Sequence, residues 1–152
     1  MSQIAIQYGL PRRGLPAATR LRRWLEQAQQ ALGEAGGLCV RLVDVAEGHQ
    51  LNADYRGKDY ATNVLSFPAN VAIDGERCLG DLVLCAPVIA REAAEQGKSL
   101  PDHYAHLLVH GLLHLLGHDH ADDAERARMQ AREQALLTDL HGTPARDPWQ
   151  GP

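Results

Sequence analysis

Three histidines with the spacing of metal ligands constrain this chain more than any other feature of its sequence. His110 and His114 stand four residues apart, and His120 follows six residues later. Residues four apart lie on one face of a helix, so the first two side chains can point towards a common position. Gly117 can end that helix, because glycine adopts the left-handed backbone at little cost, and the chain can then bring His120 back to the same position. Three imidazoles with one open coordination position are typical of a catalytic zinc site.

The sequence leaves a second choice of ligands open. Four histidines are spaced four residues apart: His106, His110, His114 and His118. An unbroken helix would therefore offer His118 as the third ligand, whereas Gly117 and the Asp119-His120 turn favour His120. A lone histidine on an apolar helix is more often satisfied by a carbonyl group or water, but several within eleven mostly apolar residues all need partners. For His103 and His106 we expect a packing, solvent-facing or ligand-supporting role.

The residue after the first histidine argues against one class of metalloenzyme. Zinc peptidases with similar histidine spacing carry a glutamate at this position as the general base. Here the position is Gly111, which has no group that could transfer a proton. The pattern therefore supports a metal site and argues against the peptidase mechanism.

Three blocks of sequence resemble one known family. The first is the histidine motif of residues 110–120, His-Gly-Leu-Leu-His-Leu-Leu-Gly-His-Asp-His. The second, residues 52–68, is Asn-Ala-Asp-Tyr-Arg-Gly-Lys-Asp-Tyr-Ala-Thr-Asn-Val-Leu-Ser-Phe-Pro, and the third, residues 79–84, is Leu-Gly-Asp-Leu-Val-Leu. Together with Met129 and Glu133 they resemble the YbeY endoribonucleases, which are bacterial rRNA maturation factors. The chain departs from the family at His118, where tyrosine is common, and at Ala61, where proline is usual.

The resemblance implies a function, a cofactor and partners. We expect a zinc-dependent endoribonuclease specific for single strands, which matures the 3′ end of small-subunit (16S) rRNA and acts in ribosome quality control. The implied partners are single-stranded RNA, the ribosome or small-subunit assembly proteins, and a GTPase. One Zn²⁺ per chain would be held by His110, His114 and His120. Two alternatives are a metallohydrolase with a peptide or small-molecule substrate, and a non-catalytic ribosome assembly factor with a structural zinc.

Arg56 is the second site residue, because the resemblance places it in the active-site cleft. A guanidinium can bind phosphate through two parallel hydrogen bonds and stabilise developing negative charge. The alternative is a salt bridge to Asp54 or Asp59. Asn63 is expected to cap the backbone beside a strand. Asp81 would either cap a turn or hold the second nitrogen of a histidine.

The apolar periodicity predicts an α+β fold. Predicted strands cover 4–8, 38–45, 64–67 and 79–85, with a turn or loop over 70–77. Predicted helices cover 21–32, 47–55, 87–96 and 101–117, and a last helix begins at Asp122. Residues 1–141 should form a single domain in which a small mixed β-sheet packs against several helices, one of them carrying the histidines. Residues 142–152 contain three prolines, and we expect a disordered tail there.

Composition and charge indicate where the protein is located and what it can bind. No apolar run reaches the roughly eighteen residues of a membrane helix, and the first residues lack a signal-peptide pattern. Three cysteines without a Cys-x-x-Cys pair suggest reduced thiols, so we expect a cytoplasmic protein with no membrane partner. The net charge is −4, yet five arginines precede the first acidic residue, Glu26. Such a segment can bind phosphates, or it can simply form a solvated surface.

Overall fold

The chain folds around a four-stranded mixed sheet with the strand order β1-β2-β4-β3. The computed structural model describes residues 3–117 and 123–141. Strands β1, β2 and β4 are parallel, and β3 pairs with β4 in the antiparallel direction. The elements in chain order are β1 (Ile4–Tyr8), α1 (Ala18–Leu32), β2 (Gly37–Val43), α2 (Val45–Arg56), β3 (Val64–Ile73), β4 (Glu76–Cys85), α3 (Ala86–Gln96), α4 (Leu100–Leu115) and α5 (Asp123–His141). The predicted α+β fold with a mixed sheet is confirmed.

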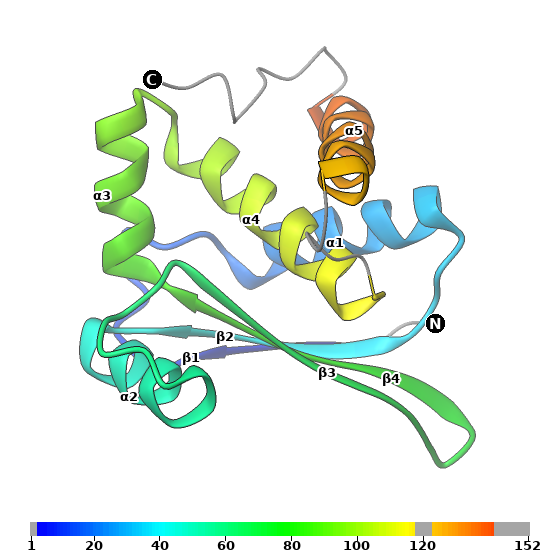
Figure 1. The fold of residues 1–152 in the computed structure, drawn as a ribbon, viewed down its shortest axis with the longest axis horizontal. Helices are drawn as coiled ribbons and strands as arrows, with labels where there is room; N and C mark the ends of the chain where they lie inside the picture. The colour runs from blue at the N-terminus through cyan, green and yellow to red at the C-terminus, as the bar shows by residue number, and fades with distance from the viewer. Residues whose placement is uncertain (1–2, 118–122, 142–152) are drawn as a thin grey trace.

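The two faces of the sheet are covered by different helices. Figure 1 shows α1, α4 and α5 on one side of the strands and α2 on the other. Side chains alternate between the faces along each strand, so Leu82 and Leu84 of β4 join the main core with α4, whereas Val83 and Cys85 join a smaller cluster beneath α2. Both faces need apolar residues at this end of the sheet, which explains the continuous apolar run of β4.

Helix α4 is the central buried element, and its ends are set by local chemistry. The Ser99 side chain accepts a hydrogen bond from the backbone N–H of Asp102 at 3.2 Å, and Pro101 occupies the first turn. The helix is buried on nearly every side, as its leucine-rich sequence requires. It ends at Leu115, and Gly117 then takes a φ of +95°, a backbone conformation that favours glycine. The prediction that Gly117 ends the histidine helix is confirmed.

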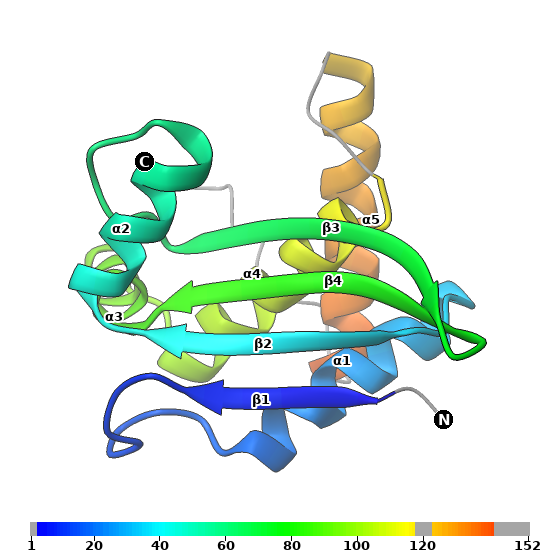
Figure 2. The same cartoon turned by 90° about the horizontal axis from the view of Figure 1, so that it is seen from below.

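The hairpin formed by β3 and β4 is longer than predicted. The expected loop over 70–77 is wrong, because β3 continues to Ile73 and β4 begins at Glu76. Pro68 does not close the strand, since β3 lies at the edge of the sheet and the register shifts between Pro68 and Val71. Asp74 and Gly75, with φ of 51° and 79°, form the tight turn. Figure 2 shows this hairpin extending past the other strands.

Other expectations on element boundaries agree with the structure to within a few residues. Strand 4–8 and the helices ending near residues 32, 56 and 96 are where the sequence placed them. The predicted start of the last helix at Asp122 and the predicted disordered tail, residues 142–152, lie outside the described residues. Of the helices in the described ranges, none is long and apolar enough to cross a membrane.

Candidate metal centre

Helix α4 presents a row of imidazoles on one stripe of its surface. The row consists of His103, His106, His110 and His114. Successive ring centroids lie 6.1, 6.2 and 4.6 Å apart. The intervals of three, four and four residues keep these side chains on one side of the helix. The closest pair of rings is His110 and His114, the two predicted ligands on this helix.

The ring nitrogens of His110 and His114 converge as metal ligands do. Their Nε2 atoms lie 3.1 Å apart. Two imidazole nitrogens bound at about 2.0–2.1 Å to one tetrahedral ion would be separated by roughly 3.3 Å. The two side chains therefore fit a shared ion without a change in the backbone of α4.

Glu133 of α5 supplies a carboxylate that the histidine spacing did not reveal. Its side chain is 1% exposed, and its Oε1 accepts a hydrogen bond from His110 Nδ1 at 2.5 Å. Its other oxygen lies 3.5 Å from His106 Nε2. Because an ionised carboxylate can only accept hydrogen bonds, His110 carries its proton on Nδ1 and directs the Nε2 lone pair towards His114. This is the arrangement in which a carboxylate orients a metal-binding imidazole.

Two opposing effects set the pKa, and so the charge, of the Glu133 carboxyl group. Burial raises the pKa of the Glu133 carboxyl, but hydrogen bonds from His106 and His110 outweigh it and lower the pKa to about 2. Burial also lowers the pKa of His106, and the Glu133 carboxylate only partly opposes that shift. Glu133 is therefore ionised at neutral pH.

A second possible position for an ion lies on the same residues. His106, His110 and Glu133 bring three potential ligand atoms within 4.8 Å of one another, so this group could hold a metal. However, the 2.5 Å between His110 Nδ1 and Glu133 Oε1 is well below the roughly 3.3 Å expected for two ligands of one tetrahedral ion. We therefore interpret this contact as a hydrogen bond that supports the His110–His114 pair.

The third predicted ligand, His120, lies outside the described residues, as do His118 and Asp119. The end of α4 still bears on the choice between the two histidines. An unbroken helix was the reason to consider His118, and α4 ends at Leu115. His120 therefore stays our prediction for the third ligand.

Gly111 has a structural reason to lack a side chain. A Cβ at this position would lie 2.7 Å from Leu82 Cδ2, and Leu82 is fully buried in the main core. The same Cβ would lie 3.4 Å from Val64 Cγ2 of β3. Helix α4 thus approaches the sheet too closely for a glutamate at the position where peptidases carry their base, which agrees with the sequence argument.

Arg56 is the last residue of α2, and Figure 1 shows this helix on the opposite side of the sheet from α4. Arg56 is exposed. The two carboxylates expected as alternative partners are engaged elsewhere: Asp54 accepts from Gln50 at 2.8 Å, and Asp59 pairs with His49 at 2.7 Å. Within the described residues no carboxylate forms an ion pair with Arg56. The structure brings His110 and His114 together but does not place Arg56 in contact with them.

The loop after Arg56 is fastened to the rest of the molecule at both ends. The buried Asn52 side chain donates to the backbone oxygen of Tyr60 at 2.7 Å. At the far end, Asn63 Oδ1 accepts from the backbone N–H of Val64 at 2.6 Å, as expected of a capping residue. The Asn63 Nδ2 also donates to Glu92 Oε1 of α3 at 3.0 Å. The segment that carries Arg56 is therefore held in a defined place.

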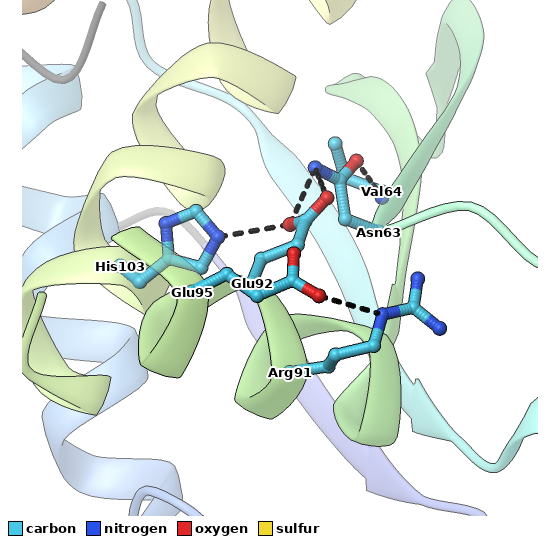
Figure 3. A network of polar contacts seen from close by, with 6 residues as sticks. All are labelled: Asn63, Val64, Arg91, Glu92, Glu95 and His103. Carbon is cyan, nitrogen blue, oxygen red and sulfur yellow. Dashed lines mark hydrogen bonds and ion pairs between the residues drawn. The ribbon is translucent and has the colours of Figure 1, made fainter. Parts of the chain in front are cut away.

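Glu92 connects this loop to the histidine helix. Figure 3 shows its carboxylate between Asn63 and His103, and the distance from His103 Nε2 to Glu92 Oε1 is 2.9 Å. Burial raises the pKa of Glu92, but the hydrogen bonds from His103 and Asn63 more than offset it, so the net shift is downward. His103 and His106 are thus buried and pair with carboxylates, which excludes the solvent-facing alternative for both.

Asp81 forms no hydrogen bond with any histidine whose side chain the structure describes. It is exposed on the α2 side of the sheet, where it lines a cavity of about 390 Å³ together with Arg41, Tyr55 and Phe67. Its neighbour Leu82 points to the other face, towards Gly111. Glu133, and not Asp81, forms the hydrogen bond to the second nitrogen of a histidine that the sequence left open for Asp81. The only sequence signal for Glu133 was its position in the family pattern.

Comparisons with known proteins show which family this chain resembles. The model of a protein family described as Endoribonuclease YbeY matches residues 15–141. A protein named Endoribonuclease YbeY from Stenotrophomonas maltophilia (strain K279a) is 56% identical over 142 residues, covering 90% of this chain and 88% of its own. A protein of the same name from Xanthomonas axonopodis pv. citri (strain 306) has the same identity and coverage. The solution structure of TM1509 from Thermotoga maritima shares the fold, with a TM-score of 0.64 and 23% identity over 99% of this chain and 100% of that one.

Proposed function

The chain belongs to the YbeY endoribonuclease family, and from that premise we propose that it cleaves single-stranded RNA with one zinc ion held by His110, His114 and His120. The observation that carries the proposal is the pair of Nε2 atoms of His110 and His114, 3.1 Å apart. Glu133 supports this pair by fixing the proton of His110 on Nδ1.

The donor set suits zinc and an anionic substrate. Neutral imidazoles are common zinc ligands, and a site of three histidines keeps the full positive charge of the ion. When bound, zinc would supply Lewis acidity, which polarises a phosphoryl oxygen and acidifies water. The chain's own residues hold the ligands in place, and Gly111 leaves α4 without the glutamate base of a peptidase.

Arg56 is proposed to bind the phosphate of the substrate. Its guanidinium is exposed and, within the described residues, has no carboxylate partner. A free guanidinium can form two parallel hydrogen bonds to phosphate oxygens. The contacts of Asn52 and Asn63 fix the loop that follows it, so the cation has a defined position before substrate arrives.

The RNA substrate, the cellular location and the partners are inferred from membership of the family. We propose that the RNA is the 3′ precursor of small-subunit rRNA, that the protein acts in ribosome quality control in the cytoplasm, and that its partners are ribosomal or small-subunit assembly proteins and a GTPase. Residues 1–141 are proposed to form the whole catalytic domain. The relatives named Endoribonuclease YbeY align with 90% of this chain, which supports a shared activity.

The test is cleavage of an end-labelled small-subunit rRNA 3′ precursor by the zinc-loaded protein and by an equally pure His114→Ala variant. Cleavage by the first alone would support the proposal and exclude a contaminating nuclease. A folded, zinc-bound wild-type protein that does not cut the precursor, either alone or with small subunits, would contradict it. Collapse of the fold in His114→Ala would instead favour a structural zinc.

A further inference from the structure

Five arginines lie in the loop after β1, which is an edge strand of the sheet, and in the first turns of α1. Four of them are exposed, and we call them the arginine edge: Arg12, Arg13, Arg20 and Arg23. The fifth, Arg22, is half-buried and donates from Nε to the backbone oxygen of Ile4 at 3.2 Å. Two of the four precede α1, and the other two lie three residues apart in its first turns, on one side of the helix.

Contacts with the core fix this edge in place. Arg12 stacks over the Tyr8 ring with its Cζ 4.4 Å from the ring centroid, and the Tyr8 hydroxyl donates to the backbone oxygen of Pro16 at 2.6 Å. Arg20 lies over Trp24 at 5.8 Å. Leu10 and Leu15 pack against the main core and hold the loop between them. Arg12 therefore lies beside Tyr8, the last residue of β1, and the half-buried Arg22 lies beside Ile4, about 13 Å along the same strand.

These charges are not neutralised locally. Residues 1–25 contain five arginines and no acidic residue. Helix α1 has no acidic residue in its first turn. Among the residues whose side chains the structure describes, no carboxylate forms an ion pair with any member of the arginine edge. Because the chain totals −4, removing the five positive charges of this segment leaves −9 for the rest of the chain.

We propose that the arginine edge is a second RNA-binding surface, which holds phosphates of the substrate strand away from the metal centre. The sheet order puts β1 and β3 at opposite edges. Helix α4 carries the histidines past β3, where Gly111 lies against Val64. Three strand spacings, about 14 Å, separate these edges, so the two sites contact different nucleotides of one strand. The inference rests on the proposed RNA substrate but not on its cleavage.

RNA fits this surface better than an acidic protein does. A polyanion is repelled by a chain of net charge −4 unless a local positive field attracts it, and RNA binding therefore requires such a patch. Arg12 stacks over the half-buried ring of Tyr8. Aromatic rings and guanidinium planes are surfaces on which the bases of single strands stack. An acidic protein would use the charges alone.

The experiment compares three variants in binding to an unstructured, fluorescein-labelled RNA of about 20 nucleotides, longer than the site of one binding fold. The first replaces the four arginines of the edge with glutamine. The second, a matched control, removes four charges elsewhere: Arg77, Arg91, Arg126 and Arg128, each to glutamine. The third replaces the four edge arginines with lysine. Fluorescence anisotropy gives the dissociation constant from about 50 to about 200 mM salt, with every protein in the His114→Ala background, so that cleavage does not enter the result.

We expect the slope of log affinity against log salt to fall in magnitude by about 2 to 3 for the glutamine variant of the edge, at about 0.7 per lost phosphate contact. The control and the lysine variant should keep the wild-type slope to within about 1. An unchanged slope in the edge variant, or an equal loss in the control, would overturn the proposal; the first result would leave an acidic protein as the partner of this surface.

A smaller variant keeps the test available if the fourfold change prevents folding. Arg13→Gln with Arg23→Gln changes two side chains that form no hydrogen bond within the described residues. It should reduce the slope by about 1.4. Binding unchanged in this folded double variant would count against the proposal as well.

Discussion

His110 Nδ1 and Glu133 Oε1 lie 2.5 Å apart, although 23 residues separate them in the chain. The contact joins α4 to α5 and is almost wholly buried at Glu133. It determines which nitrogen of His110 is available to an ion, because the protonated Nδ1 leaves Nε2 as the ligand. We therefore propose that α5 orients His110 as a metal ligand and does not itself contribute one.

Replacing Glu133 by glutamine should weaken zinc binding by about 10- to 100-fold while the fold is retained, because the amide keeps the shape but loses the negative charge that orients His110. Competition with a zinc-binding dye would measure the dissociation constant. Glu95→Gln on α3 removes an exposed carboxylate and serves as the control. If the two variants bind zinc with equal affinity, Glu133 has no role in the metal site.

Metal content should distinguish the two possible positions of the ion. With the ion on the His110–His114 pair, His114→Ala loses bound zinc and His106→Gln retains it. The reverse result would place the ion on the group formed by His106, His110 and Glu133. Elemental analysis of purified, folded protein gives zinc per chain.

The same measurement identifies the third ligand. His120→Ala should lose zinc, and His118→Tyr should keep it, because only an unbroken helix would favour His118 and α4 ends at Leu115. Loss of zinc from His118→Tyr with retention in His120→Ala would assign the third position to His118.

Arg56→Ala should slow RNA cleavage by about 100-fold, the usual effect of removing one group that stabilises negative charge in the transition state. Zinc content should not change, since Arg56 is not one of the proposed ligands. Arg56→Lys should restore only part of the rate, because lysine cannot bind phosphate through two parallel hydrogen bonds. Arg91→Ala on α3 is the control for loss of one exposed arginine, and a wild-type rate in Arg56→Ala would end the proposed role.

Gly111→Ala should destabilise the protein even though alanine favours helices. The helix propensity of alanine would stabilise by about 1 kcal/mol. Against this, a Cβ 2.7 Å from Leu82 Cδ2 overfills a buried contact, and overpacking typically costs about 1–3 kcal/mol. Urea unfolding measures the balance. The double variant with Leu82→Ala should lose less stability than the sum of the single changes, and a more stable Gly111→Ala protein would show that the contact relaxes freely.

Acidification should remove the stabilising effect of Glu92. Its folded-state pKa lies below the ordinary value of 4.5 because the hydrogen bonds from His103 and Asn63 outweigh burial. A lowered folded pKa gives stability that is present above the unfolded pKa and lost as the pH falls through the folded value. The free energy of unfolding of Glu92→Gln, measured in urea, should therefore be below that of wild type at pH 7, with the gap closing below about pH 4.5. A gap that stays constant with pH would mean that the charge of Glu92 does not contribute.

Local sequence determined much of this protein. The four-residue spacing of His110 and His114, the cap at Ser99 and the stop at Gly117 specify the histidine helix, because helix periodicity and terminal chemistry act over a few residues. The motif blocks indicated the family before any fold was known, and the comparisons show the same family. Gly111 already argued against a peptidase.

Only the tertiary structure decided which groups surround the histidines of that helix. The pairing of Glu133 with His110, and of Glu92 with His103 and Asn63, joins residues on different helices and in the loop before β3, and no local pattern encodes such contacts. The long β3–β4 hairpin depended on β3 being an edge strand, where Pro68 costs no hydrogen bond within the sheet. The sequence specifies short-range geometry, whereas the packing of α5 on α4 and the order of the strands determine where distant polar groups meet.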